Sequence, residues 1–116
     1  MLKYYGGGNM IDDTRYEDII ASIAGVAAFK VEGVASLSGV AGNRGKKQKK
    51  EKKSVQVFIL DEDSVRIDVY VNAFSGVSVP DLSYDIQESV CKEVESATKF
   101  KVKSVNVNVV GIVFNQ

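Results

Sequence analysis

The residues with the clearest chemical potential are few, and their spacing gives no recognisable active site. Asp61, Glu62 and Asp63 place three carboxylates in one short turn, a group that could bind a hard cation. Calcium sites require about six to eight oxygen ligands, in EF-hands at set spacings, and no EF-hand pattern follows this turn. A solvated turn is therefore the simpler interpretation, and we predict no metal site.

The cysteine and the glycine-rich stretches give no stronger signal. Gly6–Gly8 and Gly42–Lys46 do not fit the phosphate-binding pattern G-x-x-x-x-G-K-[ST]. Cys91 is the single cysteine, so an internal disulfide is excluded, and the chain has no histidine to serve as its base. We interpret Cys91 as a small packing residue and predict no enzymatic activity and no cofactor.

Charge, in contrast, is concentrated in one segment. The 116 residues carry fifteen Lys/Arg and fifteen Asp/Glu, for a net charge of zero. Residues 44–53 hold seven of the basic side chains and only Glu51, which gives +6 there and −6 on the remainder. The basic residues are Arg44, Lys46, Lys47, Lys49, Lys50, Lys52 and Lys53. Like charges at this density resist packing, so we expect a mobile surface loop over about residues 40–54.

An anionic partner would suit this loop, and two kinds are conceivable. Anionic lipid head groups attract each nearby lysine by about 1 kcal/mol, which predicts weak contact with a membrane surface. Nucleic acid is the alternative, although binders of single strands combine basic with aromatic side chains, and none of the latter lies between Gly39 and Val57. A loop without any ligand is the third interpretation.

The rest of the chain reads as a flexible leader over residues 1–13 and a single domain over residues 14–116. Thr14–Glu17 has the S/T-x-x-E pattern of a capping box and should open a helix. Its apolar residues recur every three or four positions, and Gly33 should end it. A second helix is expected from Pro80, with an apolar stripe of Leu82, Ile86, Val90, Val94 and Ala97.

The extended segments predict a small sheet. A short strand should follow Gly33, and the alternating runs on either side of Asp61–Ser64 predict an antiparallel hairpin. The last segment alternates up to Val109 and is then apolar on both faces, which is typical of a strand contacted from two sides. The predicted fold is α/β (α+β), in the order α-β-β-β-α-β, with both helices packed on one face of a small mixed or antiparallel sheet.

The alternation also divides the sheet into two faces. The helices should cover Val55, Val57, Ile59, Val65, Ile67, Val69, Val71, Val105, Val107 and Val109. The other face should carry Gln56, Phe58, Leu60, Tyr70, Asn106, Asn108, Val110, Ile112 and Phe114. Helix ends or loops could cover part of that face, but an exposed apolar patch usually binds a partner. We therefore predict an assembly surface formed by Phe58, Leu60, Tyr70, Val110, Ile112 and Phe114.

A family resemblance rests on three mostly apolar stretches. These are Ile20–Ala28 with Val31–Val34, Val69–Ala73 before the helix from Pro80, and Lys103–Phe114. They resemble the first helix and its turn, the middle, and the terminal strand of the alkaline shock protein family. That family comprises bacterial, mostly Gram-positive, general-stress and cell-envelope proteins.

The resemblance implies a cytoplasmic, non-enzymatic protein that assembles with copies of itself or with family members. It also implies that such a protein can reach the membrane through a membrane-anchored partner. The lysine density of residues 42–53 and the Gly-rich leader depart from the family pattern. A nucleic-acid-binding module that uses the lysine-rich loop is the alternative function.

Overall fold

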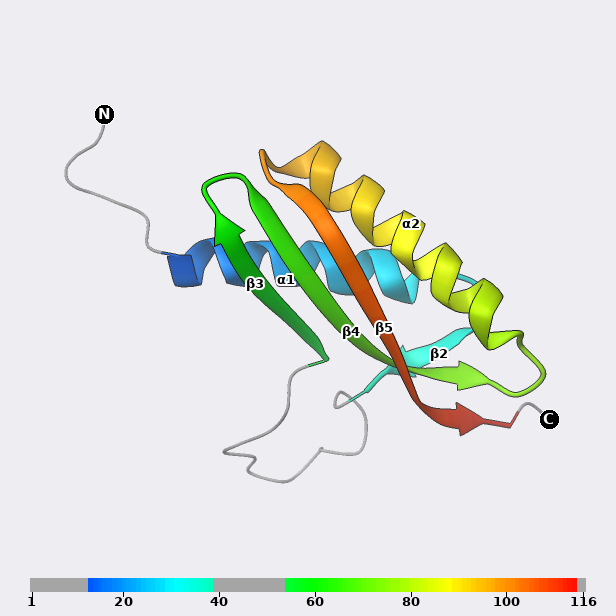
Figure 1. Cartoon of the computed structure of the whole chain (residues 1–116). Helices are drawn as coiled ribbons and strands as arrows, with labels where there is room; N and C mark the ends of the chain where they lie inside the picture. The colour runs from blue at the N-terminus through cyan, green and yellow to red at the C-terminus, as the bar shows by residue number, and fades with distance from the viewer. Residues whose placement is uncertain (1–12, 39–53, 115–116) are drawn as a thin grey trace, which may run out of the picture.

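The structure is a layer of two helices on one side of a four-stranded sheet (Figure 1). This computed structural model describes residues 13–38 and 54–114. The elements are α1 (Asp13–Phe29), β2 (Val34–Leu37), β3 (Val55–Asp61), β4 (Ser64–Phe74), α2 (Val79–Ala97) and β5 (Lys101–Val113). The predicted order and the placement of both helices on one face are confirmed. The predicted leader and lysine-rich loop lie outside the described residues, apart from Asp13 and Ser54.

Strand β4 lies at the centre of a mixed sheet. Strand β5 runs parallel to β4 along one edge, from the pair Ser64–Lys101 to the pair Phe74–Val113. Strands β2 and β3 both run antiparallel to β4 along its other edge. The predicted hairpin is therefore confirmed as β3–β4, and α2 provides the crossover that a parallel β4–β5 pair requires.

Strands β2 and β3 are two halves of one interrupted edge strand. Strand β3 pairs with β4 up to Val69, and β2 pairs with β4 from Val71 onward. At the gap, the N–H of Tyr70 donates to the Ser54 carbonyl and the Tyr70 carbonyl accepts from the Ser38 N–H, both at 2.8 Å. The Ser54 hydroxyl also donates to the Ser38 carbonyl. Residues 39–53 are thus inserted at a single position of the edge strand, opposite Tyr70.

The hydrophobic core fills the space between the helices and the sheet. Alternate residues of β4 are fully buried, and they meet two helical stripes of different bulk. Helix α1 contributes mainly small side chains, which let it lie close to the sheet: Ile20, Ala24, Ala27 and Ala28. Helix α2 contributes Leu82, Ile86, Val90 and Val94. All ten residues predicted to face the helices are buried in this core or packed against it.

The helix ends differ from the prediction in three details. Helix α1 already includes Asp13, so Thr14 lies inside the helix and not at its N-cap. Helix α1 ends at Phe29, and Gly33 lies in the turn into β2 at φ +106°, where a Cβ would be 3.1 Å from Cδ1 of Leu82. Glycine is needed there for the backbone angle and for the close contact. Ala97 is exposed because it is the last residue of α2.

Deleting residues 39–54 should join β2 and β3 into one continuous strand. Ser38 would then supply both the N–H and the carbonyl opposite Tyr70, so the ladder would keep its hydrogen bonds. Removing a closed loop of this length also removes about 2 kcal/mol of closure entropy. We therefore expect the thermal midpoint in circular dichroism to be unchanged or higher. A midpoint well below that of the intact chain would show that the deleted residues stabilise the fold.

Candidate functional site

The sheet face opposite the helices, here called the outer face, is uncovered in the described structure (Figure 1). The strand register places on it Gln56 and Phe58 of β3, and Asn106 and Asn108 of β5, while the exposed Leu60 and Val110 lie at register shifts and have no partner on β4. The central strand adds side chains that the sequence-based prediction omitted: Arg66, Asp68 and Asn72, beside the predicted Tyr70. The alternation of β4 contains these residues, so the same pattern could have revealed them.

The middle of the outer face is polar and internally bonded. The Arg66 guanidinium lies over the ring of Phe58, with Cζ 4.2 Å from the ring centroid. Its buried Nε is 3.6 Å from Oδ1 of Asp68, which makes an ion pair but no hydrogen bond. Nδ2 of Asn106 donates to the same Oδ1 at 2.8 Å. This polar centre separates the two ends of the outer face.

The predicted assembly residues therefore fall into two groups. Phe58 and Leu60 lie near the β3–β4 turn and are 38% and 51% exposed. Tyr70 is half-buried at the gap between β2 and β3. Val110, Ile112 and Phe114 lie at the opposite end of the sheet, at the end of β5.

The end of β5 carries the densest exposed apolar surface in the described part of the chain. Four of five consecutive residues are large, apolar and exposed, and we call them the C-terminal patch: Val110, Ile112, Val113 and Phe114. Phe114 is 74% exposed. The patch includes both sides of the strand end, because Ile112 pairs with Ala73 and Val113 pairs with Phe74.

The prediction that Ile112 belongs to the outer face is wrong. The β4–β5 register shifts by one residue after the pair Val71–Val109, so Gly111 pairs with Asn72 and Ile112 pairs with Ala73. Ala73 faces the helices and is fully buried. This β-bulge at Val110 reverses the alternation, which places Ile112 on the helix side of the sheet.

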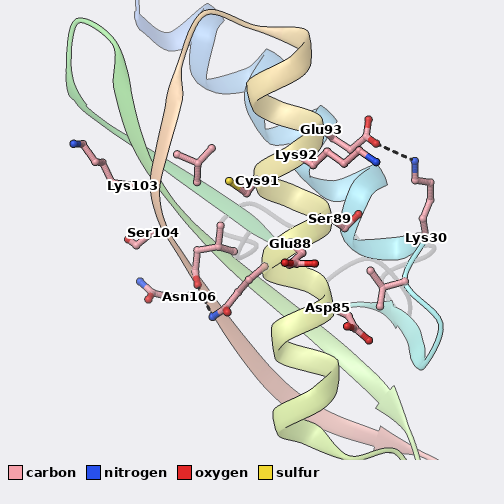
Figure 2. Close-up of a pocket in the computed structure, with 14 residues that line it drawn as sticks. Lys30, Asp85, Glu88, Ser89, Cys91, Lys92, Glu93, Lys103, Ser104 and Asn106 are labelled. Carbon is pink, nitrogen blue, oxygen red and sulfur yellow. Dashed lines mark hydrogen bonds and ion pairs between the residues drawn. The ribbon is translucent and has the colours of Figure 1, made fainter.

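A shallow surface hollow flanks α2 on both sides, with the helix standing between its two halves (Figure 2). On the α1 side, the Ser89 hydroxyl donates to the Ala27 carbonyl at 2.8 Å, and Lys30 pairs with Glu93 at 3.6 Å. The other half, which we call the β5 groove, is lined by Gln87, Cys91, Val102, Ser104 and Val105.

Two side chains of α2 bind the free edge of β5 along this groove. Nε2 of Gln87 donates to the Val105 carbonyl at 3.1 Å. The Val102 N–H donates to Oε2 of Glu95 at 2.8 Å. They occupy backbone groups that an added strand would otherwise use, so the first part of the edge is protected.

The pKa values of Cys91 and Asp61 are shifted by the groups around them. Burial, followed by the nearby charge of Glu95, raises the pKa of the half-buried Cys91 thiol, so its reactive thiolate is disfavoured. Donation from the Ser64 hydroxyl and the Asp63 N–H lowers the pKa of Asp61, whose carboxylate closes the β3–β4 turn. Within residues 13–38 and 54–114, no group of three or more acidic, Cys or His side chains could hold a metal ion.

Two further points concern nucleic-acid and membrane partners. The lysine-rich segment, Arg44–Lys53, lies outside the described residues. Neither α1 nor α2 is long and apolar enough to cross a membrane.

Comparison with known protein families identifies the family of this chain. The model of the alkaline shock protein family, described as having a cell envelope-related function, matches residues 10–114. The chain belongs to this family. The resemblance that the three apolar stretches indicated is therefore confirmed.

Two relatives support the assignment. The uncharacterized protein YqhY of Bacillus subtilis strain 168 is 34% identical over 101 residues, which covers 84% of this chain and 74% of YqhY. The uncharacterized protein Spy1535 of Streptococcus pyogenes serotype M6 is 33% identical over 95 residues, which covers 82% of this chain and 74% of Spy1535.

Solved structures with a similar fold include variants of the MamM CTD. A manganese form has a TM-score of 0.50 and a nickel form has 0.51, and each covers 81% of this chain and 96% of its own. Both share 15% sequence identity with this chain. At that identity the similarity concerns the fold alone.

The Cys91 thiol should react slowly with a disulfide reagent such as DTNB at pH 8. Its raised pKa leaves less thiolate at a given pH than an unperturbed cysteine has. Glu95→Gln removes a negative charge beside the thiol while keeping an acceptor for Val102, so it should lower the thiol pKa and raise the rate. A wild-type rate equal to that of free cysteine would contradict the burial.

Proposed function

We propose that this protein is a non-enzymatic assembly protein of the cell envelope, which acts by binding further copies of itself or other family members. The observation that carries the proposal is the C-terminal patch, four large apolar side chains exposed within five residues. Contiguous exposed apolar surface of this kind is typical of protein interaction sites. The cell envelope-related description of the family supports the setting.

The energetics favour burial of this patch. Removing one Val, Ile or Phe side chain from water contributes about 1.5–3 kcal/mol. Several such side chains from each copy can offset the cost of association, which is about 4–15 kcal/mol. The polar centre of the outer face has no comparable apolar surface to bury, and its Asp68 carboxylate already contacts Arg66 and Asn106.

The chemistry of the described residues agrees with a non-enzymatic role. Cys91 is the one thiol of the chain, and its raised pKa disfavours the nucleophilic form. The chain contains no histidine. In this proposal the protein works on the cytoplasmic side of the envelope and reaches the membrane through a membrane-anchored partner. The family description supports the envelope setting.

Val110→Lys should weaken self-association at least tenfold while leaving the monomer folded. The substitution places a charge in the C-terminal patch, where Val110 is 54% exposed and its loss disturbs little of the core. Val26→Lys is the matched control, because Val26 is 62% exposed but lies on α1, away from the patch. Sedimentation velocity over a concentration series measures both variants against the wild type.

The Val26→Lys control also provides an outcome that would contradict the proposal. Equal weakening by Val26→Lys would remove the patch as the site of association. A wild type that stays monomeric at every concentration would contradict self-association itself.

Purified protein should bind anionic vesicles only weakly and in a salt-sensitive way. The basic segment supplies electrostatic attraction, which is screened within about 8 Å at physiological salt. Co-sedimentation with vesicles of anionic and of neutral lipid, at low and high salt, measures this binding. Tight binding to neutral vesicles in high salt would contradict partner-mediated attachment, and tight, salt-resistant binding to RNA would favour nucleic acid as the ligand.

A further inference from the structure

We propose that two copies of the chain pair through the free edges of their β5 strands, antiparallel, about a two-fold axis at Asn108. This contact rests on the proposed self-association and specifies its geometry. It would join two sheets into one continuous sheet across the pair. Three features of β5 support it: the backbone groups that are free, their spacing about Asn108, and the surfaces that the strand ends would then meet.

The free backbone groups follow from the bond between Gln87 and the Val105 carbonyl. Gln87 reaches this carbonyl from outside the sheet, so the backbone groups of Val105 point away from β4. Alternate residues of a strand point the same way, so Val107 and Val109 also present their N–H and carbonyl groups to the free edge. In the described structure β5 pairs with β4 alone. This open stretch is bounded by Gln87 on one side and by the bulge at Val110 on the other.

The spacing of these groups is self-complementary. In an antiparallel pair centred on Asn108, Val107 of one copy lies opposite Val109 of the other, and the reverse pair is equivalent. Each pair exchanges two N–H to carbonyl hydrogen bonds, which gives about four in all. The half-buried side chains of Val107 and Val109 lie on the helix side and would cover one another across the new pair.

The ends of the strand also fit the second copy. Ile112 lies four residues after Asn108, and Ser104 lies four residues before it. The two-fold axis therefore brings Ile112 of one copy to the β5 groove of the other. Ile112 is on the helix side of the sheet, which is the side where that groove runs beside α2. The helix side of each C-terminal patch, formed by Ile112, would then be covered by its partner's groove.

Charge selects the antiparallel direction. Lys101 and Lys103 are the only charged residues of β5, and residues 104–114 carry none. A parallel, in-register pair would place each lysine beside its own copy, which is repulsive. The antiparallel pair places Lys103 near Val113, at the uncharged end of the partner strand.

The opposite edge of the sheet is less suited to the same contact. Its backbone ladder is interrupted opposite Tyr70, where residues 39–53 leave and return. A short edge strand, such as the four residues of β2, discourages the addition of another strand. The occupant proposed for the β5 edge is therefore a second β5.

Cysteine crosslinking tests the axis directly. In the Cys91→Ser background, Asn108→Cys places one thiol at the two-fold axis. The backbone of Asn108 points toward β4, so Asn108 would face its own copy in a non-hydrogen-bonded pair, with a Cα separation of about 4.5 Å. That separation lies within the range of disulfides. Asn106→Cys is the matched control, because the same asparagine type two residues away would lie opposite Val110 and too far from its own copy.

We expect Asn108→Cys to form a disulfide-linked dimer under mild oxidation, seen on non-reducing gels, with at least tenfold less dimer for Asn106→Cys. Equal crosslinking of both variants, or none for Asn108→Cys in a chain that sedimentation shows to be dimeric, would overturn the β5 contact and leave self-association standing. A chain that is monomeric at all concentrations would overturn both proposals.

Val107→Pro gives a second measurement. Proline removes the outward N–H of Val107, which the β4–β5 ladder does not use, and prolines are accepted at sheet edges. The variant should keep the circular dichroism spectrum of the fold and lose the dimer in sedimentation. A folded variant that dimerises like the wild type would overturn the strand contact.

Discussion

The fold depends on the burial of one side of strand β4. Val65, Ile67, Val69 and Val71 are fully buried beneath two helices, and every other strand forms its hydrogen bonds with β4. A strand in this position must alternate strictly, because a slip of one residue would turn all four side chains to the outer face. The small residues of α1 and the larger residues of α2 both pack on these four side chains of β4. The positions of the outer face and of the β5 edge follow from this one alternation.

The hairpin and the second helix could be predicted from the sequence, because each depends only on the spacing of its apolar residues. The alternation of residues 55–60 and 65–71 defines a hairpin, and the stripe from Leu82 to Val94 defines the second helix. The parallel pairing of β5 could not be predicted, because strand order depends on how distant segments pack. The face of Ile112 was mispredicted because a bulge, which depends on local pairing, interrupts a period that looks continuous in the sequence.

The candidate site was predicted less well than the fold. Phe58, Leu60 and the apolar residues at the end of β5 are exposed as expected, and Asn106 was expected on the outer face, but Arg66 and Asp68 of the polar centre were missed. The two side chains that protect the β5 edge could not be recognised in the sequence. Gln87 and Glu95 look like ordinary solvent-facing residues of a helix, and their role appears only when the helix lies beside a free strand edge.

The interrupted edge strand has a consequence for how such a chain can diverge. Ser38 and Ser54 are held together by Tyr70, so the backbone closes on itself there whatever lies between them. Because closure entropy rises only slowly with loop length, segments of very different length and composition fit at this point. Selection can then alter the charge of the intervening segment almost independently of the core, and the position is equally suited to carry a foreign peptide tag or reporter.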